Sequence, residues 1–86
     1  MPNIFVDFYG EKTQIEKLHE ETLELADAIF RHLQLQTPES KTALISEMAD
    51  VSNLIGQLAE HWNDGSVYAE RHIKQQRQLK RMREGE

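Results

Sequence analysis

Four acidic residues in two short segments are the clearest chemical signal in this chain. Glu21 and Glu24 lie three residues apart, and Glu47 and Asp50 repeat that spacing. Positions i and i+3 are neighbours on one face of an α-helix, so each pair would project from its helix as an acidic clamp. Carboxylate oxygens are the ligands that hard divalent cations of the magnesium type prefer. The spacing therefore suggests a metal centre.

Two other interpretations of these acids stay open. Glutamate is among the commonest residues on solvated helix faces, so one such pair is more often surface than site. A di-iron site would need paired Glu-x-x-His motifs, and the chain has that spacing only at Glu16 and His19. The sequence has no cysteine and four scattered histidines, which excludes zinc fingers, iron–sulfur clusters and thiol nucleophiles. Any metal must sit on oxygen ligands.

Helices are predicted to position the acids. Helix formers at helical spacing predict a first helix over residues 11–35, with Thr13 and Glu16 as a possible capping box. A second helix is predicted from an N-cap at Thr37, with Pro38 at its first position, to about Trp62. A third helix is expected from about residue 67, with Ser66 as its N-cap. The first ten residues are expected to form a separate extended segment, because apolar residues alternate there.

Both acidic clamps are predicted to border the seam between the first two helices. They fall beside two apolar stripes, formed by Ile15, Leu18, Leu25, Ile29 and Leu33 in the first helix and by Leu44, Met48, Val51, Ile55, Leu58 and Trp62 in the second. If the helices pack antiparallel, four carboxylates converge where desolvation and mutual repulsion would be severe without a cation.

Length and composition favour an oligomer. The 86 residues form one small domain with 38% hydrophobic residues and no disulfide, so an isolated core would be marginal. Leu23 and Phe30 lie on a second apolar face of the first helix, which also needs a partner. The predicted fold is all-α, with about three helices per subunit over residues 11–83, forming a four-helix-type bundle completed by oligomerisation.

The net charge of −5 hides an asymmetry along the chain. Residues 1–65 carry 12 acids and four bases, whereas residues 66–86 carry six bases and three acids. The basic segment repeats positive charges at i, i+3 and i+7, in Lys74, Arg77 and Arg81. This spacing is typical of either a phosphate-binding stripe or a solvated basic face. Nucleic-acid binding is disfavoured beside so acidic a body. No apolar run predicts a signal peptide or membrane association, so a cytoplasmic protein is expected.

The residues from Gly10 to Ile29, followed by Glu47-Met48-Ala49-Asp50-Val51, resemble the MazG-like all-α nucleoside triphosphate pyrophosphohydrolases, particularly their short phage-type members. The resemblance covers roughly residues 8–81 and rests on Glu-Glu-x-x-Glu, a spacer of 22 residues, and then Glu-x-x-Asp. The context Gln-x-x-Lys-Leu-x-Glu-Glu-x-x-Glu-Leu makes it more specific.

This resemblance implies an enzyme that splits a nucleoside triphosphate into a monophosphate and pyrophosphate with Mg²⁺, or with Mn²⁺ as its substitute. The implied metal ligands are Glu21, Glu24, Glu47 and Asp50, and the implied catalytic carboxylates are Glu20 and Glu21. The implied substrate-binding residues are Lys17, Lys74, Arg77 and Arg81. A homodimer or homotetramer is expected to close the site. The alternative is a non-catalytic helical oligomeric interaction module.

Overall fold

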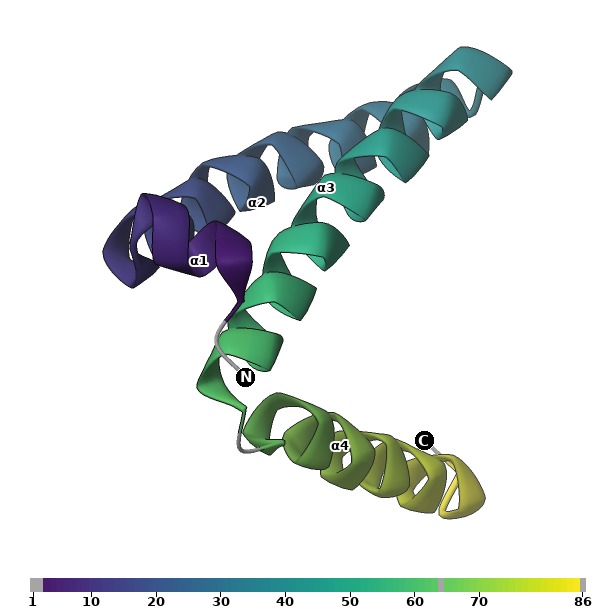
Figure 1. Cartoon of the computed structure of the whole chain (residues 1–86). Helices are drawn as coiled ribbons and strands as arrows, with labels where there is room; N and C mark the ends of the chain where they lie inside the picture. Colours follow the sequence, from purple (N-terminus) through teal and green to yellow (C-terminus); the bar gives the residue numbers. More distant parts are fainter. Residues whose placement is uncertain (1–2, 64, 86) are drawn as a thin grey trace.

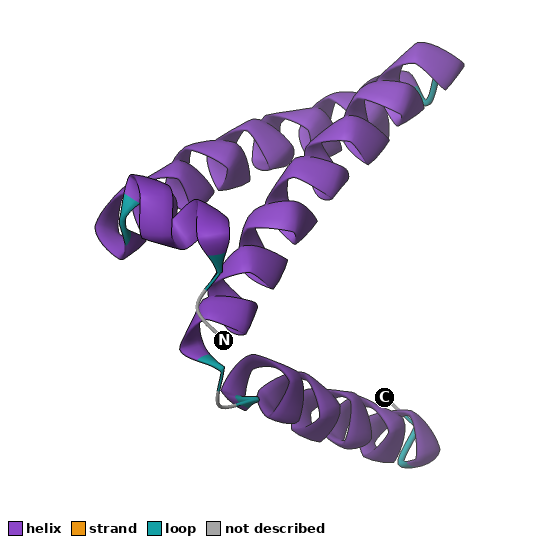
Figure 2. Ribbon diagram, viewed as in Figure 1, coloured by secondary structure: helices purple, strands orange, loops and turns teal. Residues whose placement is uncertain are grey.

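The computed structural model describes residues 3–63 and 65–85, and this part of the chain is all-α without a strand. Four helices follow one another: α1 (Ile4–Tyr9), α2 (Glu11–Leu35), α3 (Pro38–Trp62) and α4 (Ser66–Arg83). The long helices α2 and α3 form an antiparallel hairpin, and α1 lies against both of them at its open end (Figure 1). Short loops join all four helices (Figure 2).

The turn between α2 and α3 agrees closely with the sequence prediction. Gln36 ends α2 in the left-handed conformation at φ 50°, and its N–H donates to the His32 carbonyl. Thr37 caps α3: its hydroxyl accepts from the Ser40 N–H, and the Ser40 hydroxyl accepts from the Thr37 N–H in return. Pro38 occupies the first turn, where its missing N–H costs nothing. This sharp, doubly capped turn returns the chain antiparallel.

Three local predictions differ from the structure. Residues 4–9 form helix α1 instead of an extended segment, because the Asn3 side chain accepts from the Phe5 N–H and starts a helical turn. Thr13 lies inside α2, which begins after Gly10 without a side-chain cap, so the capping box with Glu16 is wrong. Helix α4 begins at Ser66 itself, one residue earlier than predicted. Of the predicted turn before it, Asp64 lies outside the described residues.

Helix α4 leaves the hairpin. Among the described residues it contacts only α3, and it runs away from α2 and α3 as a separate arm (Figure 1). None of its described side chains is buried. No helix in the described ranges has the length and apolarity that a membrane span requires.

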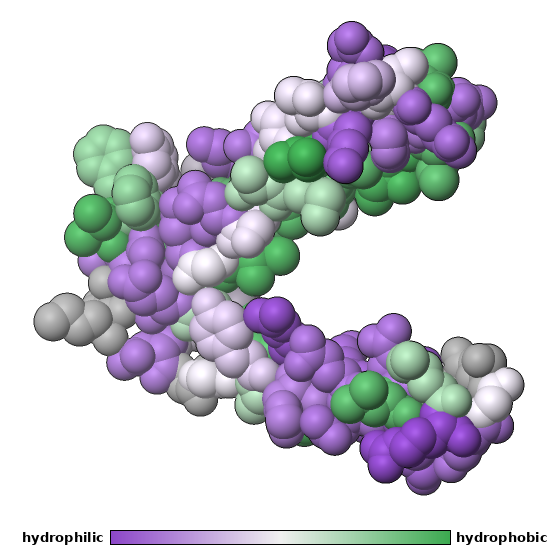
Figure 3. All heavy atoms as spheres, turned by 90° about the vertical axis from the view of Figure 1, so that its right-hand side faces the viewer, coloured by the Kyte–Doolittle hydropathy of each residue, from purple (hydrophilic) through white to green (hydrophobic). Residues whose placement is uncertain are grey.

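The apolar core of one chain is small. In the described residues, five apolar side chains are buried: Val6, Val51, Leu54, Leu58 and Ala59. Many larger apolar side chains remain exposed, Leu23, Phe30, Ile45 and Met48 each by more than half. Apolar surface is visible along the α2–α3 arm in Figure 3. A monomer of this shape buries little apolar area, and its hydrophobic stabilisation is correspondingly weak.

Candidate metal centre

The seam between α2 and α3 follows a heptad-like spacing that places polar residues inside it. The partly or fully buried positions of α2 recur at alternating steps of four and three: Gln14, Leu18, Glu21, Leu25, Ala28 and His32. In α3 the same rule runs through Ser40, Leu44, Glu47, Val51, Leu54 and Leu58, and Gln57 and Ala59 are also buried near the open end. This spacing is that of helices packed side by side with a small crossing angle. The sequence analysis expected the acids beside the apolar stripes, and the structure puts Glu21 and Glu47 in the seam itself.

Two hydrogen bonds fix the register of the hairpin. Gln14 Nε2 donates to Gln57 Oε1 at 2.7 Å near the open end. His32 Nδ1 and Ser40 Oγ lie 2.7 Å apart near the turn. Because the helices are antiparallel, seven residues forward from Gln14 to Glu21 match seven residues back from Gln57 to Asp50. The register therefore brings the two acidic clamps to the same level.

Three carboxylates meet at that level. Glu21, Glu47 and Asp50 can each contribute one carboxylate oxygen to a group whose atoms all lie within 4.8 Å of one another. Glu21 and Glu47 are half-buried, while Asp50 is exposed and leaves the group open to solvent. We call these three residues the acidic cluster. They are three of the four metal ligands that the resemblance implied.

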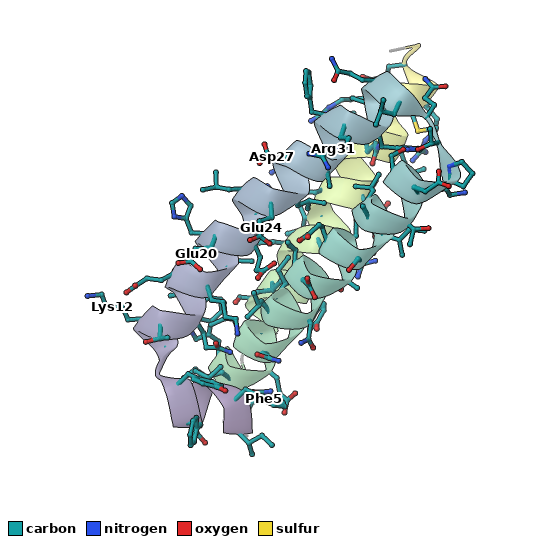
Figure 4. The ribbon with its side chains drawn as sticks, turned by 90° about the horizontal axis from the view of Figure 1, so that it is seen from above. Phe5, Lys12, Glu20, Glu24, Asp27 and Arg31 are labelled. Atoms are coloured by element: carbon teal, nitrogen blue, oxygen red, sulfur yellow. The ribbon has the colours of Figure 1, made fainter. Side chains whose placement is uncertain are left out.

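Glu24, the fourth implied ligand, is exposed and borders the acidic cluster. Its charge is among the causes that raise the pKa of both Glu21 and Glu47. Figure 4 shows Glu20, Glu24, Asp27 and Arg31 following one another along one side of α2. Glu24 is thus close enough to act electrostatically on the cluster but lies outside its tightest group of oxygens.

The acidic cluster lacks compensating partners within the described part of the chain. Glu21 Oε2 and Glu47 Oε2 are buried and make no hydrogen bond there. Burial raises the pKa of both carboxyl groups above the ordinary range, and the neighbouring acidic charges raise them further. Buried carboxylate oxygens without a donor are costly. A cation on these oxygens would remove both the desolvation cost and the repulsion.

The donor set limits the class of cation that fits. It contains carboxylate oxygens only, which suits hard cations such as Mg²⁺, Mn²⁺ or Ca²⁺ and not metals that need imidazole or thiolate ligands. His19 is exposed and is not part of the acidic cluster, and Glu16 pairs with Lys12 at 3.9 Å. The structure therefore gives no support to a di-iron site built on Glu16 and His19.

Two cavities flank the acidic cluster along the seam. The first, of about 220 Å³, is lined by Glu21 and Asp50 of the cluster and by Tyr9, Gln14, Lys17, Asn53, Leu54 and Gln57. The second, of about 190 Å³, is lined by Glu47 of the cluster and by Glu24, Asp27, Ala28, Arg31 and Ala43. We call them the amide cavity and the arginine cavity. The cluster is a wall shared by two small polar cavities.

The basic residues predicted to bind substrate fall into two groups. Lys17 lines the amide cavity, and its Nζ lies 5.7 Å from the centre of the Tyr9 ring, within the range of a cation–π contact. Lys74, Arg77 and Arg81 line a separate cavity of about 370 Å³ on α4. Because α4 does not contact α2 among the described residues, one chain does not bring these three residues to the acidic cluster.

Three residues at the site were given no role from the sequence: Gln14, Gln57 and Arg31. Gln14 is 2% exposed, although long polar side chains seldom sit in a core, and its amide is held by Gln57. Arg31 follows Glu24 by seven residues, or about two helical turns, so the two side chains share one side of α2. That i, i+7 spacing is the signal that would have connected Arg31 with the acids.

Comparisons with protein families, curated proteins and solved structures found no match to this chain.

Proposed function

We propose that this protein is a magnesium-dependent nucleoside triphosphate pyrophosphohydrolase, with Mn²⁺ as a substitute cation. The observation behind this proposal is the acidic cluster: three carboxylates within 4.8 Å, two of them with buried oxygens that lack a donor. Such a group costs stability at neutral pH, and a bound cation would remove that cost. The resemblance of the same residues to the MazG-like pattern adds the reaction type.

In this proposal the chain provides the ligands, the cavities and the proton acceptor. Glu21, Glu47 and Asp50 hold the cation, with Glu24 beside them. A bound magnesium ion supplies charge neutralisation for the triphosphate and lowers the pKa of attacking water. The water oxygen bonds to the α-phosphorus, the bond from that phosphorus to the bridging oxygen breaks, and pyrophosphate leaves. We assign the water proton to Glu20 or Glu21, and Glu20 lies on the same side of α2 as Glu24 (Figure 4).

The direct test is product analysis with a panel of nucleoside triphosphates and Mg²⁺. We expect a monophosphate and pyrophosphate in equal amounts from at least one of them. Asp50→Asn is the matched control, since it keeps the size of the side chain and removes a ligand charge. Absence of pyrophosphate from every member of the panel would reject the enzyme and favour the non-catalytic interaction module.

We also propose that the active form is a homo-oligomer that completes a four-helix-type bundle. Two observations support it: the exposed apolar side chains of the α2–α3 arm, and the isolation of α4 from α2. In this arrangement Lys74, Arg77 and Arg81 of α4 bind phosphate at the cluster of a neighbouring copy. Light scattering at low micromolar concentration should show a dimer or tetramer, and a folded monomer would contradict the proposal.

A further inference from the structure

The two cavities beside the acidic cluster differ in chemistry. The amide cavity offers an aromatic ring, an apolar side chain and three amides, together with the Lys17 ammonium group and two carboxylates of the acidic cluster. An aromatic ring that can stack and amides that can both donate and accept hydrogen bonds suit a planar nucleobase. The arginine cavity offers two alanine methyl groups, one guanidinium group and three acids. It has no aromatic ring on which a base could stack, whereas its guanidinium group suits a phosphate.

The amide cavity also has an unused hydrogen-bond acceptor. The Gln14 amide donates its N–H to Gln57, yet its own Oε1 is buried without a partner in the described residues. A buried carbonyl oxygen of this kind needs a donor. At about 220 Å³ the cavity is smaller than a typical site of roughly 300–1,000 Å³ for a drug-sized ligand, so it suits one part of a nucleotide. A nucleobase N–H is a donor of suitable size.

Position along the helix links the two cavities. Lys17, Glu24 and Arg31 follow one another at intervals of seven residues, which is about two turns or ~10 Å per interval. They therefore share one side of α2, and the labelled positions from Glu20 to Arg31 follow this side in Figure 4. The acidic cluster lies between the cavities, as the cleaved bond of a nucleoside triphosphate lies between the nucleoside and the pyrophosphate.

From this juxtaposition we infer the direction in which the substrate lies. The nucleoside occupies the amide cavity, with a base N–H donating to Gln14 Oε1, and the departing pyrophosphate lies beside Arg31. This inference rests on the proposed function for the identity of the substrate. Side chains lean toward the N-terminus of their helix, so Arg31 is directed back toward the cluster and the phosphates.

Binding of the separated halves of the substrate tests the direction without requiring turnover. The probes are four nucleosides, each beside an analogue whose base N–H donors are methylated, and inorganic pyrophosphate, all with Mg²⁺. Binding is followed by NMR through the side-chain amides of Gln14 and Asn53 and the Nε–H of Arg31. At least one nucleoside should shift the amide signals, and its methylated analogue should not.

Two variants should have opposite effects. Arg31→Met should weaken pyrophosphate binding by about ten- to a hundredfold and leave nucleoside binding unchanged. The double variant Gln14→Leu with Gln57→Leu should abolish nucleoside binding and keep pyrophosphate binding. Asn53→Ala, an exposed change in the same cavity, replaces the double variant if that variant does not fold, and it should weaken nucleoside binding.

The outcomes separate this inference from the proposed function. Loss of nucleoside binding in Arg31→Met would reverse the direction and overturn the inference, as would absence of amide shifts with all four nucleosides. Both results are possible in a protein that still releases pyrophosphate. Conversely, the expected binding pattern without any hydrolysis would uphold the two subsites and reject the enzyme.

Discussion

Two polar layers of the same seam, seven residues apart, have opposite energetics. In the amide layer, Gln14 donates to Gln57 at 2.7 Å, so two buried amides partly satisfy each other. In the acidic cluster, Glu21 and Glu47 face each other with buried oxygens that have no donor in the described part of the chain. The amide layer stabilises the register by itself. The acidic cluster opposes folding until something outside the chain neutralises it.

This contrast separates a structural polar group from a functional one. The third polar layer, His32 with Ser40, is also hydrogen-bonded, at 2.7 Å, so side-chain hydrogen bonds cross the seam near both of its ends. Only the layer between them has buried carboxylates without donors among the described residues. A site that costs stability and is flanked by cavities is a stronger sign of a ligand than the number of acids on the surface.

The largest expected effect comes from breaking the acidic cluster. Asp50→Ala should reduce magnesium-dependent activity by about a thousandfold, since a metal ion supplies several kcal/mol of transition-state stabilisation. Helicity should be unchanged, and stability without metal should be equal or higher, because repulsion in the cluster falls. Glu24→Ala should show the same pattern. Steady-state kinetics with circular dichroism and thermal unfolding measures all three quantities, and near-normal turnover in both variants would reject the metal assignment.

A smaller effect of opposite sign is expected from breaking the amide layer. Gln14→Leu leaves Gln57 Oε1 without its donor, which should lower the free energy of unfolding by about 1–3 kcal/mol. Adding Gln57→Leu removes both partners and should recover most of that loss. Urea unfolding of the two variants measures the difference. If the single and double variants lose the same free energy, the amide pair does not stabilise the register.

The fold was largely predictable because its boundaries depend on local chemistry. The turn through Gln36, Thr37 and Pro38 has a strong local capping signal, and the bounds predicted for the two long helices agree with the structure. Helix α1 was missed because six residues are too few to show a helical period, and its alternating apolar residues imitate a strand. The direction of α4 depends on tertiary contacts that one chain supplies only at its junction with α3.

Part of the site was also predictable, because the spacing of residues along a helix is a local property of the sequence. Helical spacing alone indicated that Glu21, Glu47 and Asp50 could converge, and they do. The period of the seam was recognised only in part, because polar residues occupy three of its layers. Five residues of the predicted apolar stripes do lie in the seam: Leu18, Leu25, Leu44, Val51 and Leu58. Met48, Ile55 and Trp62 were expected on the buried face of α3 and are exposed. Gln14 enters the site through the register of the hairpin, whereas the spacing of Arg31 from Glu24 within α2 is visible in the sequence.

The smallest expected effect is a pH dependence that the acidic cluster has and the amide layer lacks. The pKa values of Glu21 and Glu47 are raised in the folded chain, so folding increases their proton affinity. Their contribution to stability therefore falls as the pH rises from their ordinary pKa through the raised values, and the cost is larger at neutral pH than at pH 4. Glu47→Gln removes part of that cost, so without metal it should melt a few degrees above wild type at pH 7 and show a smaller difference at pH 4. Mg²⁺ at pH 7 should raise the melting temperature of wild type more than that of Glu47→Gln.

The matched control is the double variant Gln14→Leu with Gln57→Leu, whose difference in melting temperature from wild type should not depend on pH between pH 4 and pH 7. A difference between wild type and Glu47→Gln that is constant from pH 4 to pH 7 would show that the acidic cluster is not repulsive in the folded state.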